Sequence, residues 1–103
     1  MASHEHVIWS PSAQSDIENI TDYLMHKWGI KVVDKFLNRL RKLIKQISIN
    51  PKQYPIIYSK LNIRKCVITK QNTLYYRIKD RQIEIIRIFD TRQDPGKLKI
   101  LYS

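Results

Sequence analysis

The sequence has little of what disulfide-stabilised, low-complexity and membrane-spanning proteins depend on. It contains one cysteine, two glycines and four prolines in 103 residues. A single thiol cannot form an internal disulfide, and so little glycine and proline argues against a disordered chain. No apolar run approaches the roughly 20 residues that span a bilayer, and a signal-peptide core is lacking. We therefore expect a cytoplasmic protein with no membrane partner.

Negative charge is also scarce. Nine Asp and Glu stand against 19 Lys and Arg, which gives a net charge of +10 at pH 7 and a pI near 9.9. So basic a protein favours acidic partners such as nucleic acid, an anionic surface or an acidic protein. The length allows a single modest core. We expect one domain over residues 1–103, with a disordered N-terminus at 1–6 and a C-terminal tail at 98–103.

The residues that most enzyme motifs require are missing. Gly29 and Gly96 are isolated, so there is no glycine-rich phosphate loop, and no Cys/His set has the spacing of a zinc site. His4 and His6 have no third ligand beside them. We expect no metal and no cofactor. Three carboxylates near the start of the first predicted helix are explained by the helix dipole: Asp16, Glu18 and Asp22.

Two amphipathic helices are predicted after a short β-prone run at 7–9. Ser10-Pro11 matches an N-cap followed by proline at the first helical position. Apolar residues at helical spacing then run over 13–28 and again over 33–47, and Asn50-Pro51 ends the second helix. The Lys and Arg residues of the second helix favour a solvated face. So short a connection indicates an antiparallel helical hairpin.

The second half of the chain is β-rich. After an irregular connector at 51–60, three strand-like runs are separated by short turns, which indicates an antiparallel meander; the runs are 63–69, 73–79 and 83–90. The sequence therefore predicts an α+β fold in the order β-α-α-β-β-β, in which an N-terminal strand and a helical hairpin pack on an antiparallel sheet.

Basic and aromatic residues gather on the predicted sheet. Guanidinium groups beside phenol rings suit RNA, since they can pair with phosphates and stack on bases. Such residues are also common on half-exposed strands, and Glu84 could pair with one arginine across strands. Both interpretations stay open for this set: Arg64, Lys65, Lys70, Tyr75, Tyr76, Arg77, Arg87 and Arg92.

Ordered motifs over about residues 7–97 resemble the RelE/ParE superfamily of type II toxin–antitoxin toxins, which includes plasmid stabilisation proteins. The similar segments are WSPSAQSDIENITDYLMHKWG, FLNRLRKLIKQISINP and TLYYRIKDRQIEIIRIFDTRQDP. The resemblance implies a helical hairpin on a curved antiparallel sheet. It also implies a cognate acidic antitoxin that wraps the groove between hairpin and sheet and holds the toxin inactive.

The superfamily has two activities. RelE-like members cleave mRNA in the ribosome, whereas ParE-like members poison DNA gyrase. RelE-like members usually carry an arginine where this chain has Thr73, and a His or Tyr acid/base near the end of the sheet, where this chain has DTRQDPGK. Tyr102 lies farther out. The resemblance therefore favours a gyrase-binding inhibitor over an mRNA endonuclease, with a degenerate toxin that only binds antitoxin as a further alternative.

Each role has candidate residues, although none is assigned as catalytic; those for the antitoxin come from apolar bulk around the hairpin exit and the connector, which a partner should cover. An endonuclease would use Arg64, Lys65, Arg77 and Arg92. Arg87, Arg92, Gln93 and Asp94 are the expected contacts with the target. Asp94-Pro95 could instead have a purely structural role and end the strand. Antitoxin binding is expected at Trp28, Tyr54, Ile57, Tyr58, Arg64 and Arg77.

Overall fold

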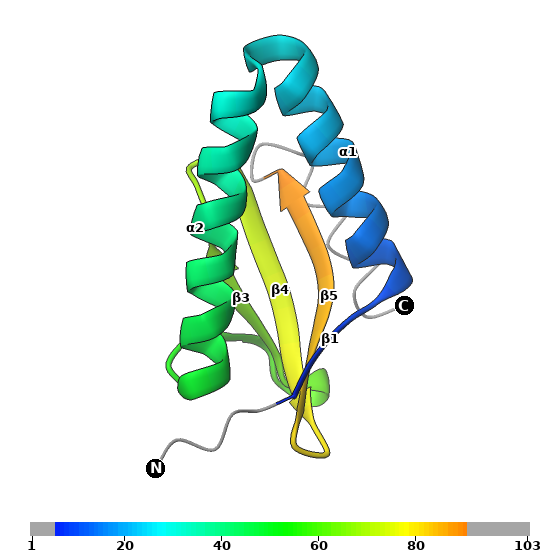
Figure 1. Ribbon diagram of the computed structural model, residues 1–103. Coiled ribbons are helices and arrows are strands. Elements are labelled where there is room, and N and C mark those ends of the chain that lie inside the picture. Colours follow the sequence, from blue (N-terminus) through cyan, green and yellow to red (C-terminus); the bar gives the residue numbers. More distant parts are fainter. Residues whose placement is uncertain (1–5, 91–103) are drawn as a thin grey trace.

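The computed structural model describes residues 6–90, which form a five-stranded sheet with a two-helix hairpin on one face (Figure 1). This confirms the predicted α+β fold and its hairpin. No helix in the described range is long and apolar enough to cross a membrane. The elements are β1 (His6–Trp9), α1 (Pro11–Trp28), α2 (Ile30–Ile49), β2 (Ile56–Tyr58), a 3-10 turn η1 (Ser59–Leu61), β3 (Ile63–Val67), β4 (Asn72–Lys79) and β5 (Gln82–Asp90).

The strands lie in the order β1-β5-β4-β3-β2. The neighbouring pairs from β2 to β5 are antiparallel, as the meander predicts. In contrast, β1 pairs with β5 in parallel, so the complete sheet is mixed. The paired residues of β1 and β5, such as His6 and Gln82, are 76 residues apart in the sequence. Only the folded hairpin between them therefore brings these strands together.

The connector at 51–60 is more regular than the sequence indicates. Residues 56–58 form the short edge strand β2, which pairs with β3. The Lys65 backbone N–H also donates to the carbonyl of Pro55 at 3.2 Å. The irregular-connector prediction is therefore wrong for 56–58, because pairing with β3 orders a run too short to show its own periodicity.

The hairpin begins and turns where the sequence predicts. Ser10 caps α1 by accepting the Ala13 N–H at 3.0 Å, and its hydroxyl donates to the Ile86 carbonyl at 2.7 Å. Gly29 ends α1 with φ of 91°, a conformation that favours glycine, and α2 starts at the next residue. One residue thus separates the helices and keeps them adjacent.

The main core lies between the hairpin and the sheet. Alternate residues of the strands point toward the helices, so Leu74 and Tyr76 of β4 are fully buried there, as are Ile83 and Ile85 of β5. The helices contribute Ala13, Leu24, Val33, Phe36, Leu40 and Ile47. This core fixes the helices on one face and leaves the other face of the sheet for a second, smaller cluster.

Candidate functional site

An ion pair between Arg87 of β5 and Asp16 of α1 joins the sheet to the hairpin. Arg87 donates from Nε to Oδ2 at 2.7 Å and from Nη2 to Oδ1 at 2.9 Å. The side chains of Arg87 and Asp16 are only 20% and 12% exposed. The hydrogen bonds to Asp16 raise the pKa of Arg87. Arg87, a predicted target-binding residue, is therefore held in a fixed position by the fold itself.

The same carboxylate completes the backbone pairing of β5. β1 pairs with β5 only as far as Ile85, and Asp16 accepts the N–H of Ile88 beyond that point at 2.9 Å. Asp16 lies past the first turn of α1, where the helix dipole acts. The dipole explanation for Asp16 is therefore wrong: the carboxylate is a tertiary contact.

Glu84 pairs across strands with one arginine, as the sequence allowed, and the structure identifies that arginine as Arg77, on the face of the sheet away from the helices. The two residues are register partners on β4 and β5, and Arg77 Nε donates to Glu84 Oε1 at 2.7 Å. Each side chain is 29% exposed. A pair this accessible contributes little stability, so Arg77 keeps a charge that a partner can reach.

Arg64 braces the connector that follows α2. Its Nη1 donates to the carbonyl of Tyr54 at 2.6 Å and to that of Lys52 at 3.2 Å. Its Nε is buried and has no hydrogen-bond partner among the described residues. Arg64, predicted for both antitoxin binding and phosphate binding, is thus already engaged with backbone carbonyls.

A buried polar cluster lies between the end of α2 and the sheet. Tyr76 is fully buried and donates to the Pro51 carbonyl at 2.7 Å, and its ring meets that of Tyr54 edge-on at 6.4 Å. Burial raises the pKa of both Tyr76 and Cys66. These groups therefore stay protonated at neutral pH and belong to the core, not to a reactive site.

The outer-face cluster covers the side of the sheet away from the hairpin. It consists of Ile63, Tyr75 and Phe89, with Ile57, Tyr58 and Ile86 packed against them. The rings of Tyr75 and Phe89 meet at 5.8 Å, and the Arg87 guanidinium carbon lies 4.5 Å from the centre of the Phe89 ring. The fold thus brings together two predicted antitoxin residues, Ile57 and Tyr58, on one face.

Trp28 is far from the other predicted antitoxin residues. It is the last residue of α1, two positions before α2 begins, whereas Tyr54 follows the end of that 20-residue helix. A helix of this length is about 30 Å long, and Figure 1 shows α2 running from the hairpin tip to the opposite end of the sheet. The six predicted residues therefore do not form one compact surface.

Trp28 instead lies near the end of the hairpin, where the side chains of Tyr23 and Trp28 are 51% and 62% exposed. We call these two residues, together with Lys27, the hairpin-tip patch. Lys27 Nζ lies over the rings of Tyr23 and Trp28, at 5.5 and 5.8 Å from their centres. The end of the hairpin thus presents aromatic surface next to a cation.

The remaining candidates fall in different places. Lys65 is exposed on β3, opposite Tyr75. Thr73, at the position where RelE-like toxins carry an arginine, is 3% exposed and pairs with Phe89. Predicted target contacts Arg92, Gln93 and Asp94 lie outside the described residues, as does Tyr102.

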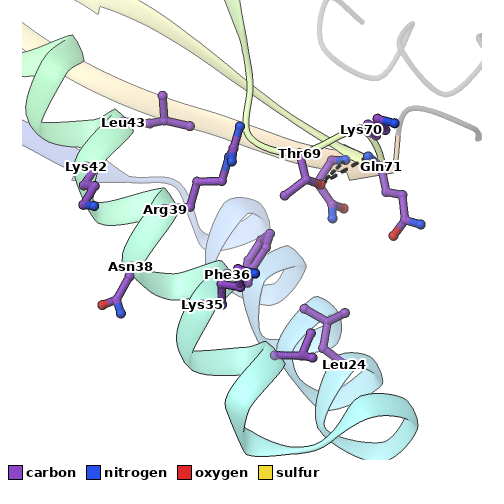
Figure 2. Close-up of a pocket in the computed structure, with 12 residues that line it drawn as sticks. Leu24, Lys35, Phe36, Asn38, Arg39, Lys42, Leu43, Thr69, Lys70 and Gln71 are labelled. Carbon is purple, nitrogen blue, oxygen red and sulfur yellow. Dashed lines mark hydrogen bonds between the residues drawn. The ribbon is translucent and has the colours of Figure 1, made fainter.

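The structure also contains a cavity of about 830 Å³ that the sequence did not reveal, here called the α2–turn pocket. It lies between α2, the end of α1 and the turn that joins β3 to β4 (Figure 2). The basic side chains Lys35, Arg39 and Lys42 recur on α2 at spacings of four and three, and this spacing is the signal that could have marked them. The other lining residues are Leu24, Val32, Phe36, Asn38, Leu43, Thr69, Lys70, Gln71 and Asn72.

The described surfaces differ in the chemical groups that they expose. Within residues 6–90, no three His, Cys, Asp or Glu side chains are close enough together to hold a metal ion. The sheet arginines Arg64, Arg77 and Arg87 are all tied to internal partners. What the described residues offer to other molecules is the hairpin-tip patch, the half-exposed pair on the outer face, and the α2–turn pocket.

Comparison with known proteins identifies the family. The model of the ParE toxin of the type II toxin–antitoxin system parDE matches residues 7–95. Toxin ParE1 of Mycobacterium tuberculosis strain H37Rv is 27% identical over 92 residues, covering 82% of this chain and 88% of the relative.

Solved structures share the fold. A chain of the chromosomal ParDE toxin–antitoxin system from P. aeruginosa matches with a TM-score of 0.64 at 20% identity, covering 85% of this chain and 98% of that one. A chain of the toxin–antitoxin complex RelBE2 from Mycobacterium tuberculosis matches with a TM-score of 0.56 at 15% identity, covering 90% and 100%. With the family model matched over nearly the whole sequence, this chain belongs to the ParE toxin family of type II toxin–antitoxin systems.

Proposed function

We propose that this toxin inhibits DNA gyrase by stabilising the complex of gyrase with cleaved DNA, and that a cognate acidic antitoxin neutralises it. The observation that carries the proposal is the match of residues 7–95 to the ParE toxin model. The toxin acts by binding and carries out no chemistry of its own. Its target contacts are Arg87, Arg92, Gln93 and Asp94.

The surroundings of the strand residues support binding over RNA cleavage. The buried thiol of Cys66 and the phenol of Tyr76 have raised pKa values, so neither serves as a proton acceptor near neutral pH. Thr73 is buried in place of the arginine of RelE-like toxins. These features leave the mRNA endonuclease, with Arg64, Lys65, Arg77 and Arg92 as its candidate residues, as the second function to test.

The antitoxin proposal follows from charge and exposed apolar surface. A net charge of +10 attracts an acidic partner and speeds its association. A partner that reaches Trp28 and also Tyr54, Ile57 and Tyr58 must extend along the length of α2, about 30 Å. An extended acidic segment that folds on binding meets that requirement.

The decisive experiment adds purified toxin to gyrase, ATP and relaxed or supercoiled plasmid. We expect trapped, linear cleavage product that increases with toxin, and we expect the cognate antitoxin to prevent it. The endonuclease alternative is tested in parallel by primer extension on translated messages after induction of the toxin.

Unaltered supercoiling at micromolar toxin, together with cleavage within codons, would replace the gyrase proposal with the endonuclease. Unaltered supercoiling without mRNA cleavage, in a host whose growth is unaffected, would identify a degenerate toxin that only binds antitoxin.

A further inference from the structure

The α2–turn pocket concentrates positively charged side chains. Lys35, Arg39 and Lys42 of α2 line it, as does Lys70 of the turn that joins β3 to β4. None of the described lining residues is acidic. Within residues 6–90, no ion pair joins Lys35, Arg39 or Lys42 to a carboxylate. Like charges three and four residues apart destabilise a helix. An anion bound in the pocket would therefore reduce the repulsion among Lys35, Arg39 and Lys42.

Arg39 is positioned for such an anion. Its Nε donates to the carbonyl of Ile68, just past the end of β3, so the side chain reaches from the helix toward the strands. Figure 2 shows this side chain crossing toward Thr69, with Lys70 and Gln71 on the turn across from the helix. To the other residues of the range 6–90, Arg39 donates only from Nε. The two Nη groups therefore keep the donors that suit a phosphate oxygen.

The remaining lining suits a nucleoside. Leu24, Phe36 and Leu43 give the pocket an apolar part, and Asn38, Gln71 and Asn72 add amide groups. Its volume of about 830 Å³ lies within the range of about 300–1,000 Å³ that is typical of small-molecule sites. Phe36 is the only aromatic lining residue among those described, whereas proteins that bind single strands stack several bases in succession. This favours one nucleotide over a strand.

We propose that the α2–turn pocket binds a free nucleoside polyphosphate. Lys35, Arg39 and Lys42 hold the phosphates, and the base packs against the apolar side formed by Leu24 and Phe36. None of the lining residues within the described range 6–90 is one of the predicted target or antitoxin contacts. The site therefore gives the toxin a small-molecule ligand beyond the proposed gyrase and antitoxin partners.

The test is direct titration of the full chain with ATP. Isothermal titration calorimetry measures the affinity, and NMR chemical shifts show which residues ATP affects. The double variant Lys35→Gln/Lys42→Gln removes two charges from the pocket. Lys31→Gln/Lys45→Gln is the matched control, because it removes two exposed lysines from the same helix outside the pocket. We expect the pocket variant to bind ATP at least about tenfold more weakly and the control to bind within about twofold of the parent.

Tripolyphosphate and a short single-stranded oligonucleotide serve as comparison ligands. We expect ATP to bind more tightly than tripolyphosphate, because only ATP has a base to bury, and to shift the amide signals of the 69–72 turn.

Three results would overturn the proposal: no ATP binding at millimolar concentration, equal weakening by both double variants, or ATP and tripolyphosphate binding alike. An oligonucleotide or an acidic peptide that binds in the pocket while ATP fails to compete would also overturn it, in favour of that ligand. Because the readout is binding, the outcome does not depend on whether the toxin acts on gyrase.

Discussion

The two faces of the sheet are built from neighbouring residues of the same strands, yet they differ in kind. Toward the helices, Leu74, Tyr76 and Ile85 are fully buried. On the other face, Arg77 and Glu84 form a half-exposed ion pair beside the outer-face cluster. The inner face forms the main core, whereas the outer face exposes charged side chains that a partner can reach.

The largest expected effect contrasts two adjacent isoleucines of β5. Ile85 is fully buried in the main core, whereas Ile86 is only partly buried against the outer-face cluster. We expect Ile85→Ala to lower the free energy of unfolding by about 3–5 kcal/mol, because it removes transfer energy and leaves a cavity. Ile86→Ala should cost about 1–2 kcal/mol.

Chemical denaturation of both variants measures the difference in the free energy of unfolding, provided that the dependence of this free energy on denaturant concentration (the m-value) is the same for both. Equal losses from the two substitutions would mean that the outer face is as much a core as the inner one.

The second prediction contrasts the two ion pairs. Asp16 holds Arg87 with two hydrogen bonds and accepts the Ile88 N–H, and its side chain is 12% exposed. We expect Asp16→Ala to cost about 2–3 kcal/mol, because it leaves a guanidinium and a backbone N–H without their acceptor.

Glu84→Ala is the comparison, and it should cost about 0.5 kcal/mol because the Arg77–Glu84 pair is accessible to water. Thermal and urea unfolding of the two variants provide the measurement. A loss at Glu84 as large as that at Asp16 would contradict the structural role assigned to the Asp16 contact.

The third prediction concerns Arg77, where the expected effect on stability is as small as that at Glu84. Arg77→Gln should change the free energy of unfolding by only about 0.5 kcal/mol. It should nevertheless slow association with an acidic antitoxin and reduce the salt dependence of that rate, because a rim charge acts mainly on the approach of the partner.

Stopped-flow binding at two ionic strengths measures both quantities. Lys79→Gln is the control, since it removes the same charge from an exposed position on the same strand. If both variants associate at the same rate, the antitoxin does not approach over Arg77.

Local patterns in the sequence determined the elements of this protein. Ser10-Pro11, Gly29 and Asn50-Pro51 marked the helix boundaries, because capping and proline geometry act over a few residues. Hydrophobic periodicity distinguished two helices from three strands, and ordered motifs over 7–97 indicated the RelE/ParE superfamily. The cross-strand pair of Arg77 and Glu84 was also predictable, since a short turn fixes its register.

Only the tertiary structure decided what lies between distant segments. The parallel pairing of β1 with β5, the 71-residue separation of Asp16 and Arg87, and the ordering of β2 by β3 all depend on how the hairpin folds back over the sheet. The α2–turn pocket depends on it as well. The basic spacing on α2 is visible in the sequence, but a helix face becomes a pocket wall only when another segment lies opposite it, and residues 69–72 are placed there by the packing of the core.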